Sequence, residues 1–160
     1  MPAVVSDTSP LRCMHHLGRI DLLGALYGEI LVPPAVADEL RSPHGELPSI
    51  DIAGMPGVRM QRPRDAEQVR NLERSLHRGE AEALALAVEL QATIIIDEQD
   101  GRAAARRLGL KTVGVLGVLV LAKRAGLVEA VSPLINRLER ELGFFVSRRL
   151  RDEVTRSAGE

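Results

Sequence analysis

The sequence Ala3-Val4-Val5-Ser6-Asp7-Thr8-Ser9-Pro10 joins a short apolar run to an acidic residue and then to the expected start of a helix. A second run, Thr93-Ile94-Ile95-Ile96-Asp97, also ends in an acid. Short apolar runs rich in β-branched residues are typical of strands buried on both faces of a parallel sheet. Ligands of open α/β sheets bind beyond the carboxyl ends of the strands, so Asp7 and Asp97 are candidates for chemistry there.

Apolar strands alternate with helical patterns along most of the chain, which predicts a parallel sheet covered by helices on both faces. The expected strands cover residues 3–6, 29–32, 58–60, 93–96 and 112–115, with a further short strand at 144–146. Between them we expect helices, including one that starts at Glu80 after an interruption at Gly79, one over 102–108 and one over 116–125. Residues 42–64 are rich in Pro and Gly and predict a long connection.

The composition excludes several classes of protein. With 160 residues, 45% hydrophobic and 27% charged, the chain fits a globular domain. Its longest apolar runs fall well short of the ~20 residues that span a bilayer, and no signal peptide is visible, so we expect a cytoplasmic protein without a membrane segment. Cys13 cannot form an internal disulfide and fits a packed thiol. The few aromatic residues, Tyr27, Phe144 and Phe145, disfavour base-stacking RNA modules.

Acidic residues also occur in two of the expected helices. Glu39 lies in the helix after the second strand, and Glu80 and Glu82 begin an alanine-rich helix. Glu80 is four residues before Leu84, which places it on the apolar side of that helix, so it is the better inward candidate. Four separate segments would therefore deliver carboxylates to one region, and a bound metal ion is the obvious reason to gather them.

Each acid also has a purely structural explanation. Asp is favoured as a helix cap and in turns, which accounts for Asp7 and Asp97. Acids in a first turn, such as Glu80 and Glu82, complement the helix dipole. Glu39 also fits a solvated position on its helix. These alternatives stay open on the pattern alone.

Four segments in order resemble a PIN domain. They are Val5 to Leu11, Val32 to Leu40, Gly79 to Ala87, and Ile96-Asp97-Glu98 with Gly101-Arg102. The similarity is nearest to the DUF3368 group, which is related to VapC-type toxins, and it extends through Gly114 to Leu127. The resemblance implies an α/β fold with three α/β/α layers, a central parallel sheet of four or five strands, and one domain over residues 1–160.

The resemblance also implies an acidic pocket that binds Mg²⁺ or Mn²⁺ and cleaves RNA. The catalytic and metal-binding residues carried over by position are Asp7, Glu39, Glu80 and Asp97. Secondary metal candidates are Glu82, Glu98 and Asp100, and substrate-binding candidates are Ser9, Arg102 and Arg106. In many PIN nucleases Asp stands where this chain has Glu80, and Asp-Phe where it has Asp100-Gly101. An oxygen-only ligand set agrees with Mg²⁺ or Mn²⁺ rather than Zn²⁺.

Three functions remain as hypotheses. The first is a metal-dependent endoribonuclease, the toxin component of a toxin–antitoxin pair, with RNA and a cognate antitoxin as partners and with a homodimer as its expected state. The second is a PIN-like module that binds RNA or a protein without cleavage. The third is an acidic-pocket protein that forms an aspartyl phosphate. Arg102 and Arg106 fit either backbone contacts to RNA or an exposed pair on one helix face.

Overall fold

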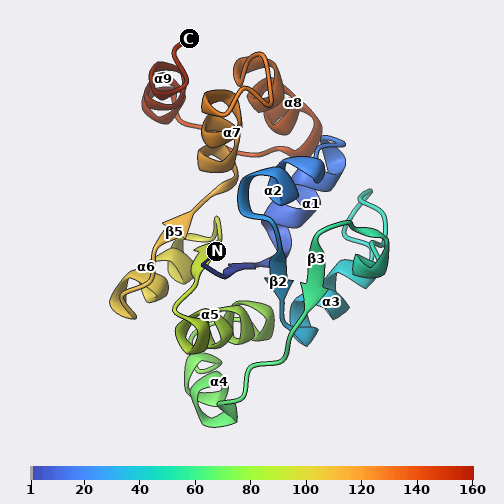
Figure 1. Cartoon of the computed structure of the whole chain (residues 1–160), viewed down its shortest axis with the longest axis vertical. Helices are drawn as coiled ribbons and strands as arrows, with labels where there is room; N and C mark the ends of the chain where they lie inside the picture. Colours follow the sequence, from blue (N-terminus) through green and yellow to red (C-terminus); the bar gives the residue numbers. More distant parts are fainter. Residues whose placement is uncertain (1) are drawn as a thin grey trace.

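A computed structural model of the chain describes residues 2–160 and contains a five-stranded parallel sheet in the order β3-β2-β1-β4-β5 (Figure 1). The strands are β1 (Val4–Ser6), β2 (Ile30–Val32), β3 (Val58–Met60), β4 (Thr93–Ile95) and β5 (Thr112–Val113). The helices are α1 (Thr8–His16), α2 (Asp21–Tyr27), α3 (Pro34–Arg41), η1 (Ile52–Gly54), α4 (Ala66–Leu72), α5 (Arg78–Leu90), α6 (Gln99–Arg107), α7 (Val115–Arg124), α8 (Ser132–Leu142) and α9 (Arg148–Ser157).

The strand order reverses at β1. From β1 the chain builds outward through β2 to β3, then crosses back to add β4 and β5 on the other side of β1. Ser6 is paired with Ile95, and the backbone N–H of Asp7 donates to Ile95 O at 3.0 Å. The connections that leave β1 and β4 therefore diverge from neighbouring points, and such a switch point is where open α/β sheets form a ligand crevice.

Helices cover both faces of the sheet, which makes the fold a three-layer α/β/α arrangement. Helix α5 packs against β1 and β4, whereas α2 packs against β2 and α7 against β5. Figure 1 shows α4 and α5 on one side of the sheet and α1, α2 and α7 on the other. The expected parallel sheet with two helical layers is confirmed.

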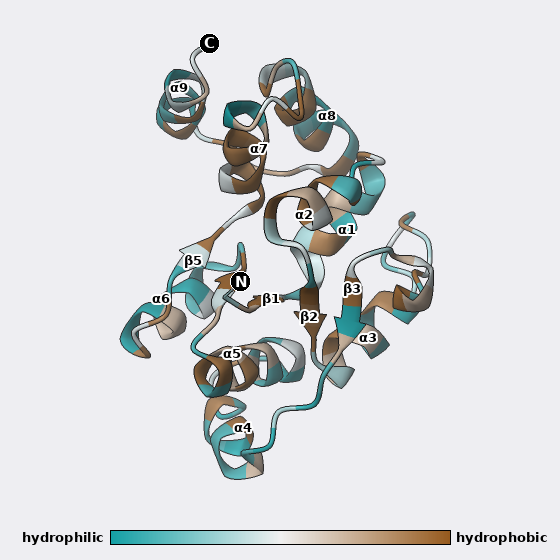
Figure 2. Cartoon of the chain, in the orientation of Figure 1, coloured by the Kyte–Doolittle hydropathy of each residue, from teal (hydrophilic) through white to brown (hydrophobic). Residues whose placement is uncertain are grey.

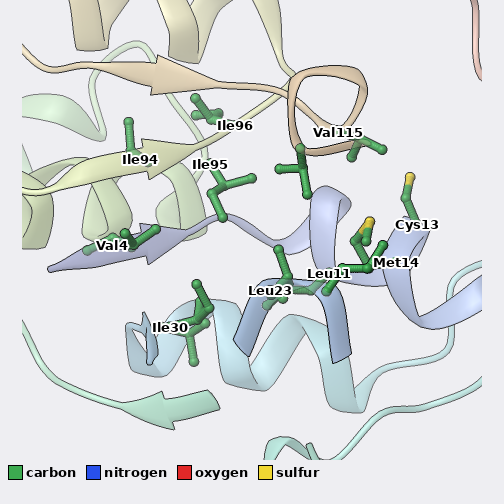
Figure 3. Packing of buried hydrophobic residues seen from close by; sticks show 14 of the residues in the cluster. Val4, Leu11, Cys13, Met14, Leu23, Ile30, Ile94, Ile95, Ile96 and Val115 are labelled. Atoms are coloured by element: carbon green, nitrogen blue, oxygen red, sulfur yellow. The ribbon is translucent and has the colours of Figure 1, made fainter. Parts of the chain in front are cut away.

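The core lies between the sheet and these helices. Strands β1 and β2 and helix α7 are strongly hydrophobic, whereas much of α4 is hydrophilic (Figure 2). Residues of β4, such as Ile94 and Ile95, are fully buried and pack with Leu11 and Met14 of α1 (Figure 3). Burial on both faces accounts for the uninterrupted apolar runs that predicted these strands.

Three local expectations are wrong. Residues 144–146 form no strand, because they connect α8 to α9 and no strand pairs with them in the sheet over residues 2–160. Helix α5 begins at Arg78 and includes Gly79, where an interruption was expected. A Cβ atom at Gly79 would collide with the Glu39 carboxylate in its present position, so the glycine leaves room for this side chain and does not break the helix. The structure also begins α6 at Gln99, three residues earlier than expected.

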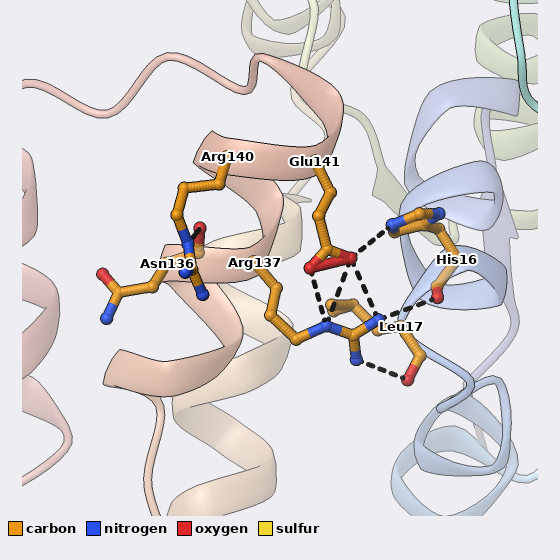
Figure 4. Close-up of polar contacts among 6 residues, drawn as sticks. All are labelled: His16, Leu17, Asn136, Arg137, Arg140 and Glu141. Carbon is orange, nitrogen blue, oxygen red and sulfur yellow. Dashed lines mark hydrogen bonds and ion pairs between the residues drawn. The ribbon is translucent and has the colours of Figure 1, made fainter.

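Polar contacts fix α8 against α1. Glu141 accepts hydrogen bonds from Arg137 and pairs with His16 at 2.9 Å, and Arg137 donates to the carbonyl oxygens of His16 and Leu17 (Figure 4). These carbonyls belong to the C-terminal end of α1, where a cation also complements the helix dipole. No helix in the described part of the chain is long and apolar enough to cross a membrane.

Candidate active site

Asp7 lies directly after β1 and is 4% exposed. It occupies the N-cap position of α1, yet within residues 2–160 its side chain accepts no capping hydrogen bond. Burial raises the pKa of Asp7 from 3.8 to about 7, the Thr8 backbone amide opposes this shift, and the charges of Glu80, Glu39 and Glu98 add to it. The carboxylate is therefore an unfavourable place for negative charge in the metal-free protein.

Glu39 is placed by α3 and contacts the start of α1. Its Oε2 accepts a hydrogen bond from Thr8 Oγ1 at 2.6 Å. Arg12, which is 8% exposed, donates to the backbone carbonyls of Glu39 at 2.5 Å and Ser42 at 2.7 Å. Arg12 thus satisfies carbonyls at the end of α3 that a helix leaves without partners, and it fixes the position of the Glu39 backbone.

Glu80 is in the first turn of α5 and is 8% exposed. Its Oε2 is buried and has no hydrogen-bond partner among residues 2–160. Burial raises the pKa of Glu80; the backbone of His77 opposes this, and the charges of Glu98 and Glu39 add to it. The same oxygen would lie 2.8 Å from a Cβ atom at Gly101, so the glycine leaves the carboxylate its space. A buried acceptor without a donor costs free energy and is an observation that favours a cation.

Glu82 has a structural role instead. Its Oε1 accepts a hydrogen bond from Ala35 N at 3.0 Å, and its Oε2 is paired with Arg78 at 3.1 Å. The carboxylate therefore caps the N-terminus of α3 and joins this helix to α5. Both oxygens are occupied, which sets Glu82 apart from Glu80.

The acids after β4 point in different directions. Asp97 Oδ1 accepts from Val115 N at 3.1 Å at the start of α7, whereas its Oδ2 is buried without a partner among the described residues. Burial raises the pKa of Asp97, with Val115 N–H and Arg102 opposing the shift and Glu98 adding to it. Glu98 and Asp100 are exposed at the start of α6.

Two neighbouring cavities divide these residues. The acidic cavity, of about 770 Å³, is lined by the carboxylates Asp7, Glu39, Glu80 and Glu98, together with residues such as Ser9 and Arg12. The second, of about 740 Å³, is lined by Asp97 and Arg102. The structure thus brings three of the four main candidates into one cavity and places Asp97 beside it. Arg106 Nε lies 3.4 Å from the carbonyl oxygen of Arg102, on the exposed side of α6.

The carboxylates have the oxygen donors that a hard cation prefers, but their side chains are not arranged as a metal-binding group in this structure. Oxygen donors from three chain segments face one cavity, and an orphaned oxygen of Glu80 is among them. However, no group of three or more His, Cys, Asp or Glu side chains in residues 2–160 stands in an arrangement that could hold a metal ion. Glu39 Oε2 accepts a hydrogen bond from Thr8, which leaves the Oε1 atom of the same carboxylate for a cation.

Sequence reasoning missed the residues that support the acids. Thr8 and Arg12 contact Glu39, and His77 and Arg78 line the acidic cavity near Glu80. One signal was available in part, because Thr8 directly follows Asp7. Arg12 gave no signal, since a buried arginine inside an otherwise apolar helix face cannot be distinguished from an exposed one by spacing.

Three α/β/α layers with acids gathered at a sheet switch point define an α/β protein with an acidic pocket at the edge of its sheet. The profile of the DUF3368 family, described as a PIN domain, matches residues 3–160. This chain belongs to that family of PIN domains. PIN domains are generally nucleases and typically use divalent metal ions.

A comparison with curated proteins gives no match. Among solved structures, the chain is similar to a PilT N-terminus domain protein from the hyperthermophilic archaeon Sulfolobus solfataricus P2. The two sequences are 20% identical, the similarity covers 74% of this chain and 90% of that chain, and the TM-score is 0.47.

Proposed function

We propose that this protein is a metal-dependent endoribonuclease that hydrolyses RNA phosphodiester bonds. The observation that carries the proposal is the acidic cavity, where Asp7, Glu39 and Glu80 converge from three chain segments and Glu80 keeps a buried oxygen without a partner. Repulsion between such carboxylates is relieved by a divalent cation, which gives a reason for the burial of Asp7 and Glu80. Membership of the PIN family supports the same chemistry.

Asp7, Glu39 and Glu80 are the residues that would hold Mg²⁺ or Mn²⁺, with Glu98 at the rim and Asp97 in the adjoining cavity. The chemistry such an ion supplies is activation of a water molecule and stabilisation of the departing oxygen. The chain itself orients the carboxylates: Thr8 and Arg12 position Glu39, and Gly79 and Gly101 leave space for Glu39 and Glu80. Ser9 lies at the same cavity, and Arg102 and Arg106 are proposed to contact the RNA backbone.

The biological setting belongs to the same proposal. We place the protein as the toxin component of a toxin–antitoxin pair, with a cognate antitoxin protein as partner and a homodimer as its state in solution. Both follow from the relation of this family to VapC-type toxins. Light scattering measures the mass in solution, and a monomer at working concentration would contradict the dimer.

One observation favours the alternative of a PIN-like module that binds RNA or protein without cleavage. In the described residues the acids do not form a ready metal-binding group. The two functions differ in one experiment, which is cleavage of a structured RNA pool with Mg²⁺, Mn²⁺ or EDTA. Metal-dependent cleavage that Asp7→Asn abolishes supports the nuclease, whereas RNA binding without products supports the binding module.

A further inference from the structure

The second cavity contains both phenylalanine residues of the chain. It has a volume of about 740 Å³ and lies among β5, α7, α9 and the connection from α8 to α9. Phe144 and Phe145 line it together with the guanidinium groups of Arg102 and Arg124. The chain has no Trp and a single Tyr, so its aromatic side chains are concentrated at this one place.

Phe145 is exposed for 84% of its surface, although large hydrophobic residues are usually buried. Leu121 and Leu150, which are each 38% exposed, line the same cavity. Exposed apolar patches of this kind mark interaction or ligand-binding surfaces.

The aromatic pair is fixed by the backbone on both sides. Gly143 ends α8 with a φ of +65°, and the next amide, that of Phe144, donates to Leu138 O at 3.1 Å. After Phe145, Val146 is 8% exposed, and Ser147 caps α9 by accepting from Leu150 N at 3.1 Å. Helix α8 is itself tied to α1 through Arg137 and Glu141 (Figure 4). A ring presented on an ordered segment loses little conformational entropy when a ligand binds.

The charges at the cavity suit a phosphate beside an apolar group. Arg102 uses one N–H for Ile96 O at 3.0 Å, and Arg124 uses one for Ser157 O at 3.1 Å, so each guanidinium keeps further donors. The acids at the lining are Asp97, whose Oδ1 bonds to Val115 N while its Oδ2 has no partner among the described residues, and Glu153, which is paired with Arg149. An aromatic face next to guanidinium groups is the combination that binds unpaired nucleotides.

Phe144 lines the acidic cavity as well as the aromatic one, so the two cavities adjoin at this residue. We propose that the aromatic cavity binds one unpaired nucleotide of single-stranded RNA, with its base against Phe145 and its phosphate near Arg102 and Arg124. The inference rests on the proposed function in taking RNA as the ligand. It adds a nucleotide subsite next to the acidic cavity.

The test is fluorescence anisotropy of a labelled single-stranded RNA of mixed sequence, in EDTA so that no cleavage occurs. Phe145→Ala is expected to weaken binding about 5- to 100-fold, the size of one lost base–aromatic stack, whereas Phe145→Trp retains the affinity. The exposure of Phe145 makes a folding defect unexpected. Met60→Ala is the matched control, since Met60 is 49% exposed on β3, at the opposite edge of the sheet.

A strand of equal length without bases separates stacking from general attraction. Phe145→Ala should not change its binding, whereas Arg124→Gln should weaken both strands and lower the slope of log affinity against log salt by about 0.7. The proposal is overturned by unchanged RNA affinity in Phe145→Ala, by an equal loss for the strand without bases, or by undetectable RNA binding in the wild type. It is also overturned if Phe145→Ala changes only the oligomeric mass, because the patch is then an interface between copies.

Cleavage is measured separately, so failure of the subsite and failure of the nuclease function can be distinguished. Base-dependent RNA binding through Phe145 without cleavage would support the subsite and contradict the nuclease. Metal-dependent cleavage with an unchanged KM in Phe145→Ala would support the nuclease and contradict the subsite. If both are correct, Phe145→Ala raises KM and leaves kcat within about twofold, since the stack contributes to binding in the ground state and transition state alike.

Discussion

Thr8 Oγ1 donates a hydrogen bond of 2.6 Å to Glu39 Oε2 across 31 residues of the chain. The contact joins the residue that follows the first acid to the second acid of the proposed site. It also provides an alternative partner for Glu39, so the carboxylate has a defined position before any cation binds. The hydroxyl thus links the local geometry at the end of β1 to that of α3.

Thr8→Val should therefore destabilise the protein modestly. The substitution keeps the shape of the side chain but leaves Glu39 without its donor, which costs about 0.5–1.5 kcal/mol at pH 7. Thr8→Ser retains the hydroxyl and should remain close to the wild type. Urea unfolding of the three proteins measures the difference, and equal midpoints for Val and Ser would show that the hydrogen bond contributes nothing.

Arg12→Ala should destabilise the protein more than Thr8→Val does. The side chain is 8% exposed and donates to the carbonyls of Glu39, Ser42 and Pro48, so its removal breaks the hydrogen bonds that join α1 to the end of α3 and to the segment after it. We expect a loss of about 2–4 kcal/mol in the free energy of unfolding, with partial recovery in Arg12→Lys. The exposed Arg41→Ala is the control. A loss below about 0.5 kcal/mol in Arg12→Ala would remove the positioning role.

The pKa of Asp7 predicts an unusual effect of pH on stability. The folded protein raises this pKa from 3.8 to about 7, so folding favours the protonated form. In the metal-free protein, the contribution of Asp7 to the free energy of unfolding is therefore fully present below pH 4 and is lost as the pH rises through 7. Asp7→Asn should be more stable than the wild type at pH 8 by about 2–4 kcal/mol, and the advantage should disappear toward pH 4.

Thermal unfolding in EDTA across this pH range measures the effect, with the exposed Asp38→Asn as the matched control. Addition of Mg²⁺ or Mn²⁺ at pH 8 should stabilise the wild type and not Asp7→Asn. A wild type that is at least as stable as Asp7→Asn at pH 8 without metal would contradict the burial argument.

Glu160 should show the opposite pH dependence. Burial disfavours its charge, but hydrogen bonds from Val131 N, Ser132 Oγ and Ser132 N, with a contact to Lys123, lower its pKa from 4.5 to about 2. Its contribution is therefore present above pH 4.5 and is lost as the pH falls through 2. Glu160→Gln should lower stability at pH 7 by about 1 kcal/mol, with Glu129→Gln as the control. A difference that persists unchanged at pH 2 would exclude this account.

The sequence predicted the centre of the sheet well because β1, β2 and β4 are buried and carry uninterrupted apolar runs. The sequence-based prediction was wrong where one residue type is compatible with two local structures. Phe144 and Phe145 resemble a strand by composition, yet Gly143 turns the chain so that they form a loop over a cavity. Gly79 resembles a helix breaker, but it lies inside α5, where the absence of a Cβ atom leaves room for the Glu39 carboxylate.

The site was predictable only to the level of chain segments. Periodicity favoured Glu80 over Glu82 as the inward residue because the two differ by about 200° around the helix, yet the structure buries both, at 8% and 4% exposed. Alternation along a strand cannot assign Asp97 and Glu98 in the same way, because the apolar strand pattern ends before them and no longer predicts which side each residue faces. The structure places Glu98 at the acidic cavity and Asp97 at the aromatic one. Distant support from Arg12 depends on tertiary packing that no local pattern contains.

The most direct test of the central claim is cleavage of a mixed RNA pool by wild type, Asp7→Asn and Asp38→Asn, purified identically, with Mg²⁺, Mn²⁺ or EDTA. We predict cleavage by wild type and Asp38→Asn with either metal, none in EDTA, and a loss of at least about 100-fold in the folded Asp7→Asn protein. Cleavage that survives in Asp7→Asn or in EDTA would show that the acidic cavity is not the active site.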